Sequence, residues 1–114
     1  MKNWDEVVAF ATSLPGTELS TSYGRPAVRV RGKAFVYPGR EQGSFALAVG
    51  LGEKEVLMET EPETFWETPH YRGWPAVLIR YGSPSRERIE MLIERAWWDR
   101  ASKAQRAERG GERP

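Results

Sequence analysis

Three short segments of alternating apolar residues follow one another with only turns between them, and this pattern most limits the fold. Residues 27–31 (AVRVR) and 34–37 (AFVY) flank Gly32-Lys33, and residues 45–49 (FALAV) come after a second turn. Alternation with a period of two is typical of half-buried strands. A two-residue turn cannot hold the crossover that parallel strands need, so the pattern predicts an antiparallel sheet.

The first two segments are predicted to form a β-hairpin. Gly32 occupies the first of the two turn positions, which favours a type II′ turn. In the register that this turn sets, residues directly opposite one another share a face. The apolar face then consists of Val28, Val30, Phe35 and Tyr37. The other face carries Arg29, Arg31, Ala34 and Val36.

The rest of the chain predicts helices around these strands and one further strand. Apolar spacing indicates helices over Trp4–Ser13 and Glu53–Glu59, a short helix over Pro62–Trp66, and a last helix from about Ser85 to about Ala104. Residues 76–81 (AVLIRY) predict a strand, whereas residues 17–24 are expected to form a loop.

This order of elements lacks the strand-helix-strand alternation of parallel sheets. It favours an α+β domain of two layers, an antiparallel sheet with helices on one face. We expect one domain over residues 1–104, followed by a polar, frayed tail over residues 105–114.

Composition excludes several kinds of site. The chain has no cysteine, which rules out disulfides, thiolate metal ligands and a thiol nucleophile. It has one histidine, His70, and none of the common catalytic or phosphate-loop motifs. We therefore expect a non-catalytic protein without a metal or cofactor. Apolar runs are short and the first residues lack a secretory core, so we expect a cytoplasmic protein that does not enter a membrane.

The formal net charge of +1 hides a separation of charges along the chain. Residues 23–40 hold five cations and no acid, whereas residues 51–67 hold six acids and one lysine. The five cations are Arg25, Arg29, Arg31, Lys33 and Arg40. On a sheet face they are suited to contact the phosphates of double-stranded DNA. The alternative is an ordinary solvated sheet face whose arginines pair with the acidic segment.

Two other functions remain open at this stage. The small outward residues Ala34, Val36, Ala46 and Ala48 predict a flat surface that suits a protein partner or a second copy of the chain. A set of loop residues predicts instead a small-ligand site, formed by Tyr23, His70, Tyr71 and Trp74. His70 alone is equally compatible with a histidine that only orders its turn.

Five motifs occur in a fixed order along the chain. They are residues 14–18 (LPGTE), 22–27 (SYGRPA), 30–35 (VRGKAF), 65–71 (FWETPHY) and 73–79 (GWPAVLI). Their order and spacing resemble the YjbR/MmcQ-like family of small bacterial proteins, from Trp4 to about Ala101. The resemblance implies a two-layer fold of order α-β-β-β-α-β-β-α, with the fifth strand within residues 70–73.

The same resemblance implies a role in DNA binding through two projecting hairpins, described for that family as a double wing. It brings no catalytic residues. The matching wing here is the hairpin around Gly32-Lys33, and the turn from Arg40 to Ser44 is the candidate for a second wing.

Overall fold

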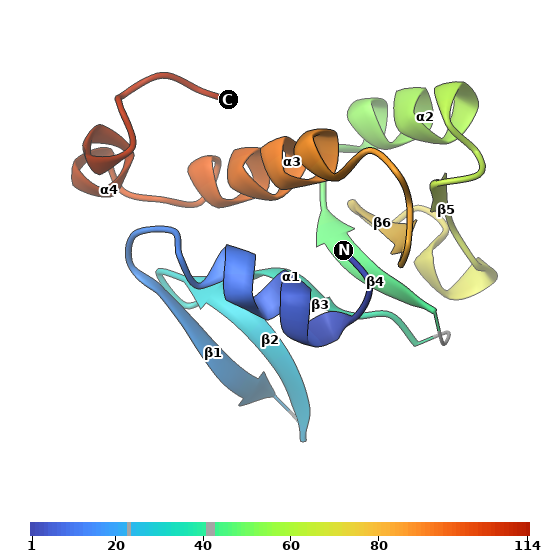
Figure 1. Ribbon diagram of the computed structural model, residues 1–114, viewed down its shortest axis with the longest axis horizontal. Helices are drawn as coiled ribbons and strands as arrows, with labels where there is room; N and C mark the ends of the chain where they lie inside the picture. Colours follow the sequence, from blue (N-terminus) through green and yellow to red (C-terminus); the bar gives the residue numbers. More distant parts are fainter. Residues whose placement is uncertain (23, 41–42) are drawn as a thin grey trace.

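The computed structural model describes residues 1–22, 24–40 and 43–114. Along the chain its elements are α1 (Trp4–Ala11), β1 (Thr17–Ser22), β2 (Arg25–Val30), β3 (Lys33–Pro38), β4 (Ser44–Ala48), α2 (Leu51–Thr60), β5 (Phe65–Trp66), the 3-10 helix η1 (Pro69–Tyr71), β6 (Ala76–Arg80), α3 (Arg86–Trp98) and α4 (Lys103–Glu108). The strands form one antiparallel sheet of order β1-β2-β3-β4-β6-β5 (Figure 1).

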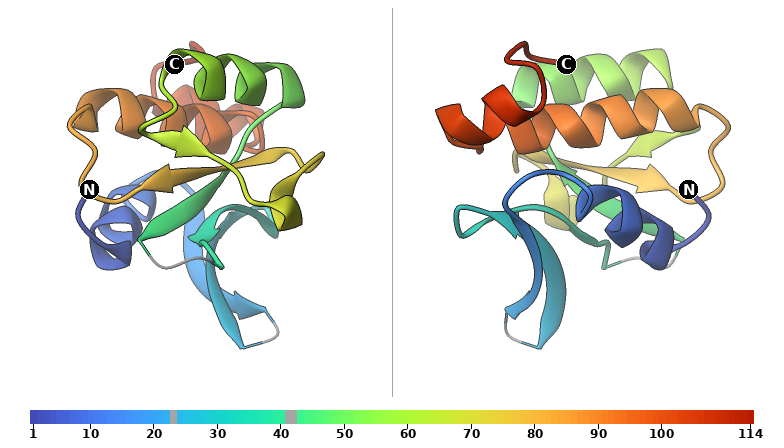
Figure 2. Two further views of the ribbon diagram at one scale, coloured as in Figure 1. Left: turned by 90° about the vertical axis from the view of Figure 1, so that its right-hand side faces the viewer. Right: turned by 60° about the vertical axis from the view of Figure 1, so that its left-hand side comes forward.

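The long helices cover one face of this sheet, which confirms the predicted α+β class (Figure 2). Asn3 begins α1 by accepting a hydrogen bond from the Glu6 backbone N–H at 2.9 Å. The main core lies between helices and sheet, and its largest fully buried side chains include Trp97, Phe35 and Phe45. The Trp97 indole N–H donates to the Pro15 carbonyl at 2.8 Å, so its burial leaves no polar atom unpaired.

The segment expected to form a loop at residues 17–24 contains strand β1. It pairs along its whole length with β2, from Thr17 opposite Val30 to Ser22 opposite Arg25. β1 is polar and lies at the sheet edge, where its one large apolar residue, Leu19, stays 51% exposed. An edge strand with so little apolar surface gives no alternating pattern, because strand signals reflect burial.

The short helix expected over Pro62–Trp66 is not formed, because residues 62–64 make a turn that leads directly into a strand. Phe65 and Trp66 form β5 beside β6, where Phe65 lies opposite Ile79 and is buried. The strand expected within residues 70–73 is replaced by η1 and a turn. Pairing with the buried strand β6 gives Phe65 an apolar neighbour across the sheet that a short helix would not supply.

The turn between β2 and β3 lies one residue earlier than predicted. Arg31 and Gly32 have φ values of 53° and 76°, and Val30 pairs with Lys33. Positive φ at both central residues is the conformation of a type I′ turn rather than type II′. Val30 therefore does not lie opposite Phe35.

A β-bulge in β3 then changes which side chains face the helices. Arg29 pairs with Ala34 but Val28 pairs with Val36, so Phe35 is the additional residue. Phe35 and Val36 are both fully buried in the main core. The predicted alternation therefore fails here: Val36 faces the helices, and Tyr37 faces the opposite side of the sheet.

The last predicted helix divides into two. α3 ends at Trp98, and α4 starts after Ser102, whose hydroxyl accepts from Gln105 N at 3.1 Å. The Gln105 side chain accepts in return from Ser102 N at 2.8 Å, completing a capping box. Serine at this position favours a new helix start over a continuous helix.

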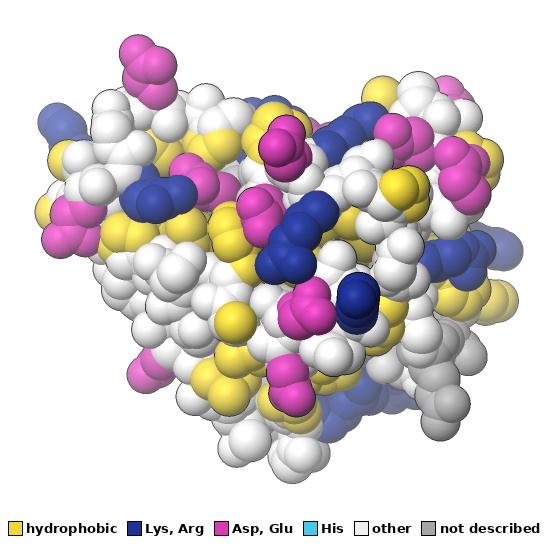
Figure 3. All heavy atoms as spheres, in the orientation of Figure 1, with side chains coloured by type: hydrophobic (Ala, Val, Ile, Leu, Met, Phe, Trp, Pro, Cys, Tyr) yellow, Lys and Arg dark blue, Asp and Glu magenta, His cyan; other side chains and the backbone are white. Residues whose placement is uncertain are grey.

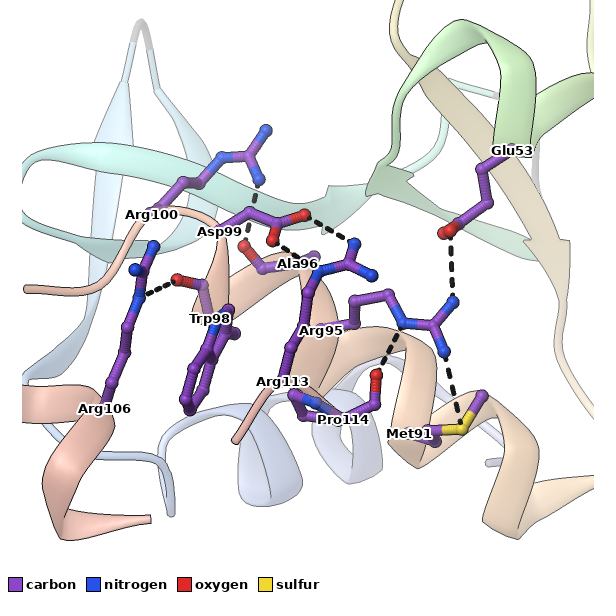
Figure 4. Close-up of polar contacts among 10 residues, drawn as sticks. All are labelled: Glu53, Met91, Arg95, Ala96, Trp98, Asp99, Arg100, Arg106, Arg113 and Pro114. Carbon is purple, nitrogen blue, oxygen red and sulfur yellow. Dashed lines mark hydrogen bonds and ion pairs between the residues drawn. The ribbon is translucent and has the colours of Figure 1, made fainter. Parts of the chain in front are cut away.

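The C-terminal residues return to α3, as Figure 4 shows. Arg113 contacts Asp99 at 2.9 Å, and Arg95 donates to the Pro114 carbonyl at 2.9 Å. Arg106 lies over the Trp98 ring, 5.2 Å from its centroid. Across the described residues, the helices are too short and too polar to span a lipid bilayer.

Candidate functional site

The face of the sheet that points away from the main core carries a second row of packed side chains. Tyr37 lies opposite Ala46, Ala46 opposite Leu78, and Leu78 opposite Trp66. Tyr71, from the connection between β5 and β6 (residues 67–75), packs on this row and is buried. The connection thus covers the centre of the outer face and leaves the β2–β3 side uncovered.

A cavity of about 620 Å³ lies between β2–β3 and this connection. Its lining is Arg25, Pro26, Ala27, Arg29, Ala34, Tyr37, Pro38, Arg40, His70, Tyr71 and Trp74. The volume lies within the usual range of ligand pockets, about 300–1,000 Å³. Residues predicted for two different functions, phosphate contact and ligand binding, therefore surround one site.

The arginines of the cavity are positioned by neighbouring polar groups. Arg29 donates through Nε to the Ser20 hydroxyl at 2.9 Å and through Nη1 to the Gly32 carbonyl at 3.3 Å. Arg25 donates through Nη2 to the Pro38 carbonyl at 3.3 Å. A guanidinium has five N–H donors, so both retain donors for a ligand.

The acidic segment pairs with the helices and not with these arginines. Glu53 contacts Arg95 at 3.1 Å, and Glu61 contacts Arg88 at 2.6 Å. Basic and acidic side chains accordingly lie close together over the helical face in Figure 3. The alternative in which the acidic segment neutralises the basic hairpin is thus overturned for the described residues.

Around the cavity itself, acidic groups are few. Among residues 1–22, 24–40 and 43–114, no carboxylate makes an ion pair with Arg25, Arg29 or Arg40. The nearest acid in the sheet register is Glu18, which lies opposite Arg29 on β1. The cavity therefore presents positive charge that no described ion pair offsets.

The five predicted cations do not all line one cavity. Arg31 stands at the β2–β3 turn and is exposed. Lys33 lines a separate hollow of about 330 Å³ together with Asp99 and Arg100. The shifted turn explains this separation, because Lys33 pairs with Val30, whose side chain faces the helices. Only Arg25, Arg29 and Arg40 line the large cavity.

The predicted ligand loop is largely assembled. His70 and Tyr71 meet edge to face with ring centroids 4.9 Å apart, and Trp74 is 62% exposed. All three line the cavity. Tyr23 lies outside the described residues.

Lys54 fixes the wall that carries these rings, and no motif or spacing in the sequence singles it out. Its Nζ donates to the carbonyl oxygens of Tyr71 at 2.8 Å and Trp74 at 3.0 Å, and it pairs with Glu67 at 2.8 Å. The Lys54 side chain is only 3% exposed. At the other end, the Tyr71 hydroxyl accepts from the Arg40 backbone N–H at 3.2 Å. The connection is thus held on two sides.

Tyr37 is the second cavity residue that the sequence placed elsewhere. The bulge turns it from the predicted core face into the cavity. Burial raises the pKa of Tyr37 above its ordinary value, the Tyr71 hydroxyl acts in the same direction, and Arg100 opposes them. The Tyr37 phenol therefore stays neutral to a higher pH than that of an exposed tyrosine.

The flat apolar surface predicted for a protein partner is not present. Val36 and Ala46 are fully buried and Ala48 nearly so, while Ala34 lines the cavity. The bulge moves Val36 to the main core, and Tyr71 covers the row at Ala46.

Both the sequence and the architecture of this chain are similar to those of known proteins. The model of the YjbR family matches residues 12–98. Uncharacterized proteins of Mycobacterium tuberculosis and Mycobacterium bovis are each 30% identical over 119 aligned residues, covering 90% of this chain and 92% of theirs. A crystal structure of a Deinococcus radiodurans protein with a DUF419 domain superposes with a TM-score of 0.75 at 17% identity, covering 98% of this chain and 96% of that one. The structural likeness supports the fold.

Proposed function

The chain belongs to the YjbR family, and from its arginine-lined cavity we propose that it binds DNA without catalysing a reaction. In this proposal Arg25, Arg29 and Arg40 contact phosphates. Arg31 at the neighbouring turn adds positive charge just outside the cavity.

One observation carries the proposal, the convergence of Arg25, Arg29 and Arg40 on one cavity without ion pairs to described carboxylates. Planar guanidinium groups with unused donors bind phosphate oxygens well. Figure 2 shows the β1–β2 hairpin, which carries Arg25 at its turn end and Arg29 toward its base, projecting away from α2 and α3. A projecting hairpin that carries two arginines is accessible to a long anion such as a DNA strand.

Positive charge outside the cavity favours a polymer over a small anion. The guanidinium carbon of Arg80 lies 4.4 Å from the centroid of the Trp66 ring. Arg80 is on the same outer face of the sheet as the cavity but does not line it. Arg72 is exposed within the connection. A small ligand touches only the lining, whereas a strand can reach cations on both sides of it.

The chemistry of the site supports binding without catalysis. General base catalysis needs a group poised to take a proton, and a raised pKa of Tyr37 corresponds to a neutral phenol. His70 makes an edge contact to Tyr71, and within the described residues it has no hydrogen-bonding partner to orient it.

A second candidate is the binding of a small anionic, aromatic ligand, which the volume of about 620 Å³ favours. The two candidates differ in the size of the molecule that binds. Calorimetry with thymidine monophosphate, in parallel with an oligonucleotide, separates the two candidates. Tight binding of the free nucleotide without binding of the oligonucleotide would support the small-ligand function.

The test is fluorescence anisotropy with labelled duplex and single-stranded oligonucleotides of one sequence, at about 50 and about 200 mM salt. We expect binding at the lower salt that weakens steeply at the higher. R25A/R29A should lower affinity about tenfold or more and flatten the salt dependence. K2A/K103A, which removes the same charge from exposed positions outside the cavity, should change affinity little. The absence of salt-dependent binding to either oligonucleotide would overturn the proposal.

A further inference from the structure

We infer that the cavity accepts one unstacked base of a single DNA strand, so that the protein prefers unpaired DNA to a duplex. This inference rests on the proposed DNA binding and specifies its substrate. It follows from how two kinds of side chain are distributed over the walls of the cavity.

The two walls carry different chemistry. The wall from β2, β3 and the following turn contains three arginines, Arg25, Arg29 and Arg40. The wall from the connection supplies rings, those of His70, Tyr71 and Trp74. A nucleotide has the same division, because its phosphate is anionic and its base is flat and aromatic. The arrangement places the sugar-phosphate backbone along the hairpin and a base against the connection.

Trp74 is the clearest indication that the cavity binds an aromatic ring of a ligand. It is 62% exposed, the highest exposure among the large apolar side chains of the described residues. Its backbone is nevertheless fixed, since Trp74 N donates to the Tyr71 carbonyl at 3.0 Å and the Trp74 carbonyl accepts from Lys54 Nζ at 3.0 Å. An indole held in water on a fixed backbone gains nothing for folding. It is suited to stack on a base.

The concave shape of the site argues against a duplex. In a duplex the bases are stacked and only phosphates and groove edges reach the surface. A base must leave the stack before it enters a concave pocket, and unpairing makes this costly. In a single strand the bases are free to turn outward, so stacking on an aromatic wall adds to the phosphate contacts. The preference for single strands is therefore a direct consequence of the cavity's shape.

The experiment compares three labelled probes of equal length by fluorescence anisotropy at one low salt concentration. They are a single strand of about ten thymidines, the same strand with abasic sites throughout its centre, and a duplex. We expect the thymidine strand to bind about tenfold more tightly than the duplex. The abasic strand should lose this advantage while keeping its dependence on salt, because its phosphates remain.

Substitutions at Trp74 test whether the ring is responsible. W74A should weaken binding of the thymidine strand about tenfold and leave duplex and abasic affinities unchanged, whereas W74F should retain most of the preference. V56A is the matched control, because Val56 is 56% exposed on α2 and does not line the cavity. A structural role for Trp74 would lower all three affinities together.

The outcomes separate the inference from the proposed function. Equal affinity for strand and duplex, or a W74A effect of the same size on both, overturns the base-in-cavity inference and leaves DNA binding in place. No binding of any probe overturns both. Preference for the thymidine strand that W74A removes supports both.

Discussion

Lys54 Nζ lies 2.8 Å from the carbonyl oxygen of Tyr71, so a lysine from the acidic helix α2 holds the aromatic wall of the cavity. The same ammonium group also donates to the Trp74 carbonyl at 3.0 Å and forms an ion pair with the Glu67 carboxylate at 2.8 Å. Lysine is rarely buried unless it is paired in this way. The position of the exposed Trp74 ring therefore depends on the hydrogen bond that Lys54 donates to the Trp74 backbone carbonyl.

Replacing Lys54 by methionine tests this dependence. K54M keeps most of the apolar stem of the side chain but leaves two carbonyls without their donor and Glu67 without its ion-pair partner. We expect a loss of about 2–3 kcal/mol in the free energy of unfolding, measured by urea denaturation. K103M, at an exposed position, is the control and should cost far less. An unchanged midpoint for K54M would show that the connection is held by its other contacts.

Much of the fold follows from the sequence because burial repeats with a regular period. The stripe Ile89, Leu92, Ile93, Ala96 and Trp97 is buried, as helical spacing over the last segment predicts. The cap at Asn3 and the strand at Ala76–Arg80 also appear where local chemistry puts them. These features depend on residues close together in the sequence.

The features that escape prediction depend on partners distant in the sequence. β1 is a strand only because β2 lies beside it, and its own residues carry almost no apolar signal. The bulge at Phe35 reverses the faces of Val36 and Tyr37, and period-two reasoning assumes that no residue is inserted. Lys54 looks like one cation in an acidic run until Tyr71 is placed next to it.

The candidate site was predicted in two halves that the sequence could not join. Charge points to Arg25 and Arg29, whereas clustering in one loop points to His70, Tyr71 and Trp74. About forty residues separate the two groups, and the sheet order β2-β3-β4-β6 determines that they meet. Spacing in the sequence carries no information on that order.

The phenol of Tyr37 predicts a pH dependence at the alkaline end. Burial raises its folded-state pKa above the ordinary value of 10.0, so the folded protein holds this proton more tightly than the unfolded chain. Its contribution to stability is complete below about pH 10 and is lost as the pH rises through the folded pKa.

Urea denaturation from pH 8 to 11 should therefore show a steeper loss of stability for the wild type than for Y37F. Tyr81, whose pKa is also raised by burial, is present in both proteins and does not affect the comparison. If the free energy of unfolding fell equally with pH in the two proteins, the pKa of Tyr37 would be the same in the folded and the unfolded chain.

The turn at Arg31-Gly32 predicts a gain of stability from a single substitution. Arg31 has a φ of 53°, a left-handed conformation that costs energy for most residues but suits asparagine. R31N should raise the free energy of unfolding by about 0.5–1 kcal/mol, visible as a higher thermal midpoint. G32A should lower it by about 1 kcal/mol, because Gly32 has a φ of 76°. A destabilised R31N would indicate that the arginine side chain stabilises the turn.

The ion pair of the C-terminal residues predicts an acid titration. The Arg113 guanidinium, which donates to both carboxylate oxygens of Asp99 at 2.9 and 3.0 Å, holds the pKa of that carboxyl below its ordinary 3.8. The stabilisation is present above the unfolded pKa and is lost as the pH falls through the folded pKa. Both side chains are nearly half exposed, so solvent screening keeps the effect to a few tenths of a kcal/mol.

Carbon-13 NMR of the Asp99 carboxyl measures this directly. R113A should raise its titration midpoint, whereas K103A, which removes a charge from the exposed start of α4, should leave the midpoint close to that of the wild type. The same midpoint in R113A and wild type would mean that the C-terminal residues do not rest on α3 in solution. The contact matters for the cavity's neighbour as well, because Asp99 lines the smaller hollow with Lys33. Loss of the Arg113 contact therefore leaves the Asp99 carboxylate unpaired beside Lys33, which was predicted to contact DNA but lines this hollow instead of the large cavity.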